Sequence, residues 1–256
     1  MKKSACLITL LLGISVTVYA TPYDHIHLAA PDTTEAAQWY AKHFEGRASR
    51  FRDSNDTSLP IDRAMFDGIS IVFAAREPGE GSVGTGVDHI GFSISNVEEA
   101  INAAVADGAK GIGDLISFGG MTIGFIEDPW GTKIELIDDS SLRGIHHIHL
   151  STPDPAATLQ WYQNIFGGES ALFADVLPGI KYGDFWVLAR RSSGEIAPTQ
   201  GRSLDHLGWN FPDLDAAAME IKAKGTDFTL EPRDYRGIRI SFVEGPDEVR
   251  IEIVQP

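Results

Sequence analysis

Two stretches of the chain are near copies of each other: HIHLAAPDTTEAAQWYAKHFEG from His25 to Gly46, and HIHLSTPDPAATLQWYQNIFGG from His147 to Gly168. About half of the aligned positions are identical, including both histidines, the Pro-Asp pair and the Gln-Trp-Tyr triplet. Similarity at this long spacing indicates that the chain contains two related halves. Each copy begins a structural unit, and the fold of the chain follows from the structure of that unit.

A second repeat lies downstream of the first in each half. VDHIGFSISNVEEAINAAVADGAK begins at Val87, and LDHLGWNFPDLDAAAMEIKAKGTD begins at Leu204. The match continues to the ends of the halves, where KIELI at Lys133 corresponds to RIEIV at Arg250. Each half therefore contains two units, and the four units begin near Tyr23, Val87, Ile145 and Leu204.

The four units share one order of expected elements. Each opens with a short alternating strand, continues into a helix with a capping pattern such as Asn96 followed by Glu99, and ends in strands rich in β-branched and aromatic residues. This order predicts an α+β fold of four βαβββ units, arranged as two pseudo-symmetric domains over residues 21–139 and 145–256. One unit cannot cover its own sheet, so we expect pairs of units to form half-open barrels whose concave faces hold a ligand.

Histidines and glutamates recur at matching positions of these units. Residues two apart in a strand share a face, so His25 and His27 point the same way, as do His147 and His149. A carboxylate in the middle of a final sheet strand is costly unless it is paired or ligated. Taken half by half, the candidate sets are His25 or His27 with His89 and Glu135, and His147 or His149 with His206 and Glu252.

Each set resembles a facial triad for a metal ion. Two imidazoles and one carboxylate on one face leave open positions on a divalent ion such as Fe, Mn, Zn, Ni or Co. Oxygens of a small-molecule substrate can bind at these positions and become polarised. Two possibilities stay open: one of the two sites can be a relic, and the halves can pair within a monomer or across a homodimer.

The order of these motifs resembles the vicinal oxygen chelate superfamily, which includes glyoxalases, bleomycin-resistance proteins and extradiol dioxygenases. The resemblance rests on the first-strand His, the WY-x₃-F-x-G helix end, the second-unit His and the final Glu in DPWGTKIEL. It implies glyoxalase-like domains with cupped mixed sheets. The spacing from the first His to the helix Tyr is similar to that of glyoxalase I, which implies these metal ligands: His25, His89, Glu135, His147, His206 and Glu252. His27 and His149 are then candidate catalytic bases beside the metal.

The resemblance implies an enzyme that chelates vicinal oxygens of a small organic substrate on a divalent metal ion, with glyoxalase-like lyase or isomerase chemistry. The strands ISIVFAAR and DFWVLARR lack the fourth ligand, a Glu, of glyoxalase I. Phe125 and Phe242 stand where extradiol dioxygenases carry a Tyr. An extradiol-type ring-cleaving dioxygenase and a metal-free small-molecule binding or sequestering protein are the alternatives.

The N-terminus predicts export. Lys2 and Lys3 precede an apolar run from Leu7 to Val18, and Val-Tyr-Ala ending at Ala20 is typical of a signal-peptide cleavage site. We therefore expect a signal peptide over residues 1–20 and a secreted, periplasmic protein with no membrane attachment after cleavage. Cys6 is the one cysteine of the sequence, so the mature chain would have no thiol. The net charge of −15 disfavours nucleic acid as a partner.

Overall fold

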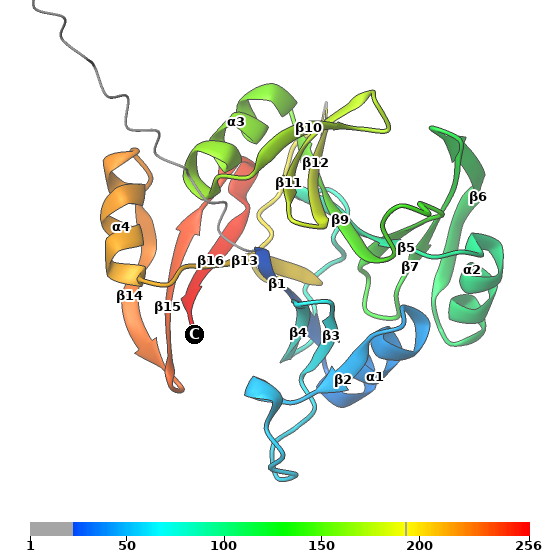
Figure 1. The fold of residues 1–256 in the computed structure, drawn as a ribbon. Helices are drawn as coiled ribbons and strands as arrows, with labels where there is room; N and C mark the ends of the chain where they lie inside the picture. Colours follow the sequence, from blue (N-terminus) through cyan, green and yellow to red (C-terminus); the bar gives the residue numbers. More distant parts are fainter. Residues whose placement is uncertain (1–22, 193) are drawn as a thin grey trace, which may run out of the picture.

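The computed structural model describes residues 23–192 and 194–256, in which the chain forms four α-helices and sixteen strands (Figure 1). The strands lie in two eight-stranded mixed sheets, and the predicted α+β class of four βαβββ units is confirmed. The predicted signal peptide, residues 1–20, lies outside the described residues. No helix in the described part of the chain is long and apolar enough to span a membrane.

Each unit contains one α-helix and four strands. Unit one comprises β1 (Tyr23–Ala30), α1 (Thr33–His43), β2 (Arg47–Ser49), the 3-10 turn η1 (Phe51–Asp53), β3 (Arg63–Phe66) and β4 (Ile69–Ala75). Unit two comprises β5 (Val87–Ser93), α2 (Val97–Ala106), β6 (Lys110–Phe118), β7 (Met121–Glu127) and β8 (Lys133–Ile137). Unit three comprises β9 (Gly144–Thr152), α3 (Pro155–Phe166), β10 (Glu169–Phe173), β11 (Leu177–Tyr182) and β12 (Phe185–Arg191). Unit four comprises β13 (Leu204–Asn210), α4 (Leu214–Ala223), β14 (Phe228–Tyr235), β15 (Ile238–Glu244), the 3-10 turn η2 (Pro246–Glu248) and β16 (Arg250–Gln255).

Side-chain caps begin all four α-helices. Asp32, Asn96, Asp154 and Asp213 each accept a hydrogen bond from a backbone N–H of the following first turn. Such caps satisfy donors that have no partner inside the helix, and they are typically worth about 1 kcal/mol each. The caps therefore fix where each opening strand stops and its helix starts.

The two sheets combine units from different halves of the chain. Sheet 1 has the order β14-β15-β16-β13-β1-β4-β3-β2 and joins units one and four, whereas sheet 2 has the order β10-β11-β12-β9-β5-β8-β7-β6 and joins units two and three. At the centre of sheet 1, β1 pairs antiparallel with β13, and His27 lies opposite His206. At the centre of sheet 2, β5 pairs antiparallel with β9, and His89 lies opposite His149. Grouping the ligands half by half is therefore wrong.

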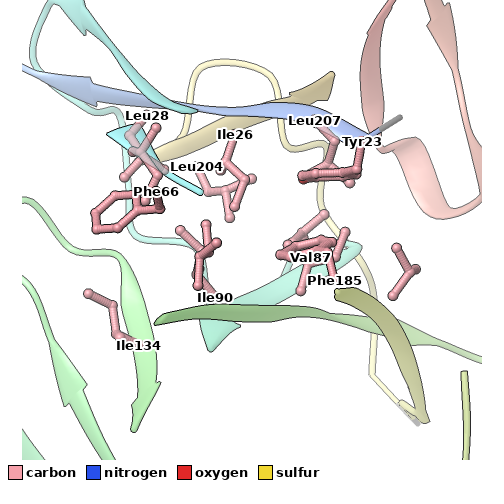
Figure 2. Close-up of a cluster of buried hydrophobic side chains, with 14 of the residues drawn as sticks. Tyr23, Ile26, Leu28, Phe66, Val87, Ile90, Ile134, Phe185, Leu204 and Leu207 are labelled. Atoms are coloured by element: carbon pink, nitrogen blue, oxygen red, sulfur yellow. The ribbon is translucent and has the colours of Figure 1, made fainter. Parts of the chain in front are cut away.

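The two sheets pack against each other through the faces that carry no site histidines. Ile26 lies between His25 and His27 in the sequence, so the alternation of the strand turns it to the opposite face. Figure 2 shows Ile26 of sheet 1 facing Ile90 of sheet 2, and Leu207 facing Val87, in this apolar core. Tyr23 also stacks on Phe185 of the other sheet, with ring centroids 4.3 Å apart. The site faces of the two sheets are therefore separate surfaces.

Helix-end aromatic residues pack the two units of each half against each other. Phe44, after α1 of unit one, stacks on Phe92 of unit two with ring centroids 4.1 Å apart. Phe166, at the end of α3 in unit three, stacks on Trp209 of unit four at 4.3 Å. Within each half the two units thus pack face to face across the core. Their central strand edges remain free to pair with the other half.

Candidate metal centres

Two clusters of metal-competent side chains lie among the described residues, one in each sheet. Site 1, in sheet 1, contains His25, His206 and Glu252. Site 2, in sheet 2, contains the side chains of His89, Glu135, His147 and His149. In each cluster the ligand atoms lie within 4.8 Å of one another. The six residues predicted from the sequence therefore do converge, but each site takes ligands from both halves of the chain.

Glu252 is the centre of site 1. Its Oε2 accepts a hydrogen bond from His206, 3.2 Å from Nε2. The Nε2 of His25 lies 3.0 Å from the same oxygen, at an angle that does not make a hydrogen bond. All three residues are buried. Two imidazole nitrogens and one carboxylate oxygen thus converge at one point with little water around them.

Glu135 holds the same place in site 2. Its Oε2 lies 3.0 Å from His89 Nε2 and 3.7 Å from His147 Nε2. His147 is fully buried, and His89 and Glu135 are nearly so. Since Glu135 and Glu252 stand at matching positions of β8 and β16, the repeat reproduces the site as well as the fold.

An aspartate supports the second-unit histidine of each site. Asp88 lies 2.6 Å from His89 Nδ1, and Asp205 lies 2.6 Å from His206 Nδ1. A carboxylate on Nδ1 fixes the ring so that Nε2 is presented to a metal ion. Sequence reasoning missed these aspartates, although the repeated Asp-His pairs in VDHIGF and LDHLGW were a usable signal.

Basic side chains that reach in from the surface neutralise the two buried supporting aspartates. Asp88 is bound by Lys133 and Arg190, and Asp205 is bound by Arg76 and Arg250, at 2.7 to 2.8 Å. Burial alone would raise the pKa of each aspartate, but hydrogen bonds from the adjacent histidine and these cations hold the pKa well below its usual range. Both carboxylates are therefore ionised, and each can orient its imidazole.

The support of the first-strand histidine differs between the sites. At site 1, His25 Nδ1 lies 2.7 Å from Asp24 Oδ1. At site 2, His147 Nδ1 lies 2.8 Å from Nδ1 of His146, whose Nε2 lies 3.3 Å from Asp139. Site 1 thus has a carboxylate where site 2 has a second imidazole.

This difference in support changes the charge at the two sites. Burial would lower the pKa of His25, but its contacts with Asp24 and Glu252 outweigh burial and raise the pKa to about 9. Burial also lowers the pKa of His147, and there the attraction of Glu135 does not reverse the shift. Without a metal ion, the first-strand histidine is therefore protonated at neutral pH in site 1 and neutral in site 2.

Both glutamates are ionised in spite of their burial. Burial would raise the pKa of Glu252, yet hydrogen bonding to His206 and contact with His25 lower it below the usual range. The pKa of Glu135 is lowered in the same way, chiefly by His147 and then by His89. An ionised carboxylate beside two imidazoles is a suitable ligand set for a divalent cation.

A glycine makes room for the first-strand imidazole in each site. A Cβ atom on Gly208 would lie 2.2 Å from Cε1 of His25, and one on Gly91 would lie 2.0 Å from Cε1 of His147. Any larger residue would push the ring out of the cluster. These glycines are part of the repeated Asp-His-x-Gly pattern, which the sequence interpretation did not single out.

The histidine nitrogens that face the glutamates fit a metal ion. The Nε2 atoms of His25 and His147 are buried and lie 3.0 and 3.7 Å from an oxygen of Glu252 and Glu135, but neither makes a hydrogen bond within the described part of the chain. A cation between each carboxylate and its imidazole would use these poorly oriented donor atoms as ligands.

His27 and His149 line the site faces beside the clusters. The ring of His27 lies 4.4 Å from the ring of His206, and the ring of His149 lies 4.8 Å from that of His89. His149 belongs to the ligand cluster of site 2, whereas His27 lies outside the cluster of site 1. A catalytic role for either residue stays a prediction.

A cavity of about 290 Å³ lies on sheet 2, and none of the site 2 ligand candidates lines it. Trp186 lines it and is in register with His147 on the adjacent strand, so both side chains stand on the site face. Met121 and Phe173 add apolar wall, and Lys181 and Asp139 add charge. The cavity is large enough for a small organic molecule.

Comparisons with known proteins agree with this architecture. The family model described as Glyoxalase/Bleomycin resistance protein/Dioxygenase superfamily matches residues 23–136 and 144–253. No curated protein matches the sequence. Among solved structures, glyoxalase I from Zea mays is similar with a TM-score of 0.68 and 17% identity, covering 92% of this chain and 92% of the maize chain. A protein from Bacillus subtilis subsp. subtilis str. 168, named as a candidate dioxygenase, is similar with a TM-score of 0.66 and 16% identity, covering 92% of this chain and 85% of its own.

Proposed function

The chain belongs to the Glyoxalase/Bleomycin resistance protein/Dioxygenase superfamily, and from this premise we propose that it is an exported metalloenzyme acting on a small organic substrate with neighbouring oxygens. The reaction proposed is a glyoxalase-like lyase or isomerase step. One observation supports this proposal above all others: two histidines and a glutamate converge at each of two buried points. Each complete site is formed by one chain, so both a monomer and a homodimer satisfy the proposal.

In site 1, different residues would bind the metal ion and accept the substrate proton. His25, His206 and Glu252 would hold a divalent ion, and Asp24 and Asp205 orient the two imidazoles. A bound ion would polarise substrate oxygens and stabilise negative charge that develops on them. The chain itself must then supply a group that accepts the substrate proton.

His27 is the proposed proton acceptor of site 1. Burial, together with the neighbouring imidazoles of His206 and His25, lowers the pKa of His27 well below its ordinary value. The ring is therefore neutral near pH 7 and carries one lone pair. Its position beside His206 on the site face supports this role. His149, the matching residue of site 2, lies instead within the ligand cluster of that site.

A ring-cleaving dioxygenase is the second candidate. Site 1 has the two-histidine, one-carboxylate set that non-haem Fe(II) oxygenases use. Metal content distinguishes the two candidates. Stoichiometric iron with oxygen consumption would favour the dioxygenase, and zinc, nickel, manganese or cobalt would favour the lyase or isomerase.

The test is metal analysis of the purified chain together with variants of each site. We expect two divalent ions per chain, falling to one in Glu252→Gln and to one in Glu135→Gln. No bound metal in the purified chain or after incubation with each candidate ion would overturn the metalloenzyme and leave a metal-free binder. Export is tested separately, by fractionation of cells that produce the full chain and by N-terminal sequencing. Recovery of the uncleaved chain outside the periplasm would overturn the proposed location.

A further inference from the structure

We propose that site 2 holds its metal ion with four protein ligands, His149 being the fourth, whereas site 1 holds its ion with three. This inference rests on the proposed function, because it concerns the same metal centres. It assigns a new role to one histidine and makes the two sites different in kind.

Ligand atoms of four residues converge at site 2. One nitrogen of His149 lies within 4.8 Å of a ligand atom of each of His89, Glu135 and His147. His27 occupies the matching position of the repeat on β1, yet it does not belong to the cluster of His25, His206 and Glu252. Equal positions in the backbone therefore place the two imidazoles differently.

The two imidazoles also differ in ring orientation. The plane of His27 makes an angle of 31° with the plane of His206, with ring centroids 4.4 Å apart. The plane of His149 is tilted by 57° from that of His89, at a centroid distance of 4.8 Å. The two rings therefore pack differently against the second-unit histidine, although they stand at matching positions of the repeat.

The ring nitrogens of His149 also distinguish it from His27. Both Nδ1 and Nε2 are buried without a hydrogen-bond partner in the part of the chain that the structure describes. At His27, Nδ1 alone is in that condition. A neutral imidazole has one N–H and one lone pair, and leaving either unsatisfied in the interior is costly. Coordination to an ion held by Glu135 would use the lone pair of His149.

A fourth ligand changes what each site can do. A fourth protein ligand would leave one position fewer for substrate oxygens at site 2 than at site 1, whatever the coordination number of the ion. Site 2 should therefore retain its ion more tightly, and site 1 should offer more room for substrate oxygens. A chelator should therefore remove the ion from site 1 before it removes the ion from site 2.

The experiment compares matched variants in two single-site backgrounds. Glu252→Gln leaves site 2 alone, and Glu135→Gln leaves site 1 alone. His149→Gln is added to the first background and His27→Gln to the second. Zn²⁺ affinity is measured by competition with a chromophoric chelator, and the number of bound imidazoles is measured by X-ray absorption of the Zn²⁺-loaded protein.

We expect His149→Gln to weaken Zn²⁺ binding at site 2 by at least about tenfold, since loss of an outer-shell partner alone costs about 10–100-fold. His27→Gln should change binding at site 1 by less than about threefold. The imidazole count should be three in the Glu252→Gln background and two in the Glu135→Gln background. This count needs no substitution of His149, so it decides the question even if that variant fails to fold.

Two imidazoles at site 2, with Zn²⁺ affinity unaffected by His149→Gln, would overturn the four-ligand assignment and leave the proposed function standing. Absence of Zn²⁺ binding in both backgrounds and in the unaltered chain would overturn the proposed function itself. The two failures are therefore distinguishable.

Discussion

Site 1 and site 2 arise from the same repeated positions but differ in the residue beside the first-strand histidine. Asp24 supports His25, whereas His146 supports His147. The carboxylate contributes to a pKa of about 9 for His25, while the pKa of His147 is lowered. The comparison teaches that the repeat determines where the ligands stand, and that one neighbouring side chain determines their charge before metal binding.

A second comparison concerns the helix tyrosines, which pack behind the sites. Tyr40 donates a 2.6 Å hydrogen bond to buried Asp128. Tyr162 stands at the matching position of α3, but its hydroxyl has no hydrogen-bond partner among residues 23–192 and 194–256. A Cβ atom on Gly245 would lie 3.4 Å from that hydroxyl, so glycine stands near where unit two has its aspartate. Duplicated positions thus tolerate the loss of a partner away from the ligands.

The largest expected effect is the loss of metal affinity at one site when its glutamate is replaced, with the other site unchanged. Glu252→Gln should weaken metal binding at site 1 by about 100-fold or more, because a lost ligand costs at least as much as a lost outer-shell partner. Site 2 should be unaffected, because its ligands lie in the other sheet. Metal titration of His25→Ala, Glu135→Ala and the double variant checks the grouping. Loss of only one ion in the double variant would show that His25 and Glu135 bind the same ion, as the grouping within each half of the chain had it.

Replacement of either site glycine should give the next largest effect. Gly91→Ala and Gly208→Ala force the adjacent imidazole to move, and overpacking of this kind typically costs about 1–3 kcal/mol. We expect each variant to lose the ion of its own site and to melt at lower temperature. Gly194→Ala is the control, since a Cβ there has no neighbour within 4 Å. Full metal content in both site variants would contradict the proposed placement of the rings.

The pH dependence of metal binding should distinguish the sites by about tenfold per pH unit. A histidine must lose its proton before it binds a metal ion. Because the pKa of His25 is about 9, affinity at site 1 should rise with pH up to about 9. His147 has a lowered pKa, so its protonation should not weaken binding at site 2 near neutral pH. Zn²⁺ titrations of the two single-site variants from pH 6 to pH 9 measure both slopes, and Asp24→Asn should flatten that of site 1.

The smallest expected effect is on folding stability. Tyr40→Phe removes a buried hydrogen bond to a charged group and should lower the free energy of unfolding by about 1 kcal/mol or somewhat more. Tyr162→Phe removes an unpaired buried hydroxyl and should be neutral or slightly stabilising. Urea denaturation of both variants makes the comparison. Equal losses would show that Tyr162 has a partner in solution.

Much of the architecture could be predicted, because the spacing of apolar residues in the repeat indicates which segments are strands and which are helices. The alternation in HIHL placed His25 on one face and Ile26 on the other, as the structure has them. The partner of each unit could not be predicted, because local pattern contains no information on which strand edges meet. That choice depends on distant contacts such as Phe44 on Phe92 and Phe166 on Trp209.

The ligand residues could be predicted one by one, but not their grouping or support. His25 and Glu252 are 227 positions apart in numbering and meet only because β1 joins β13, which joins β16. His146 could not be predicted as a supporting residue, because the matching position of the first half holds Asp24, a different residue type. The different tilts of His27 and His149 depend on packing around equivalent backbones, and no sequence pattern reports such packing.

The arrangement of the sheets has a consequence for the order of folding. Sheet 2 consists of one continuous segment, from β5 to β12, so all of its strands lie close together along the chain. Sheet 1 joins β1 to β4 with β13 to β16, which lie on either side of that segment. Pairing of β1 with β13 closes a loop that contains all of sheet 2, and closure of a longer loop costs more conformational entropy, so we expect sheet 1 and site 1 to form after sheet 2.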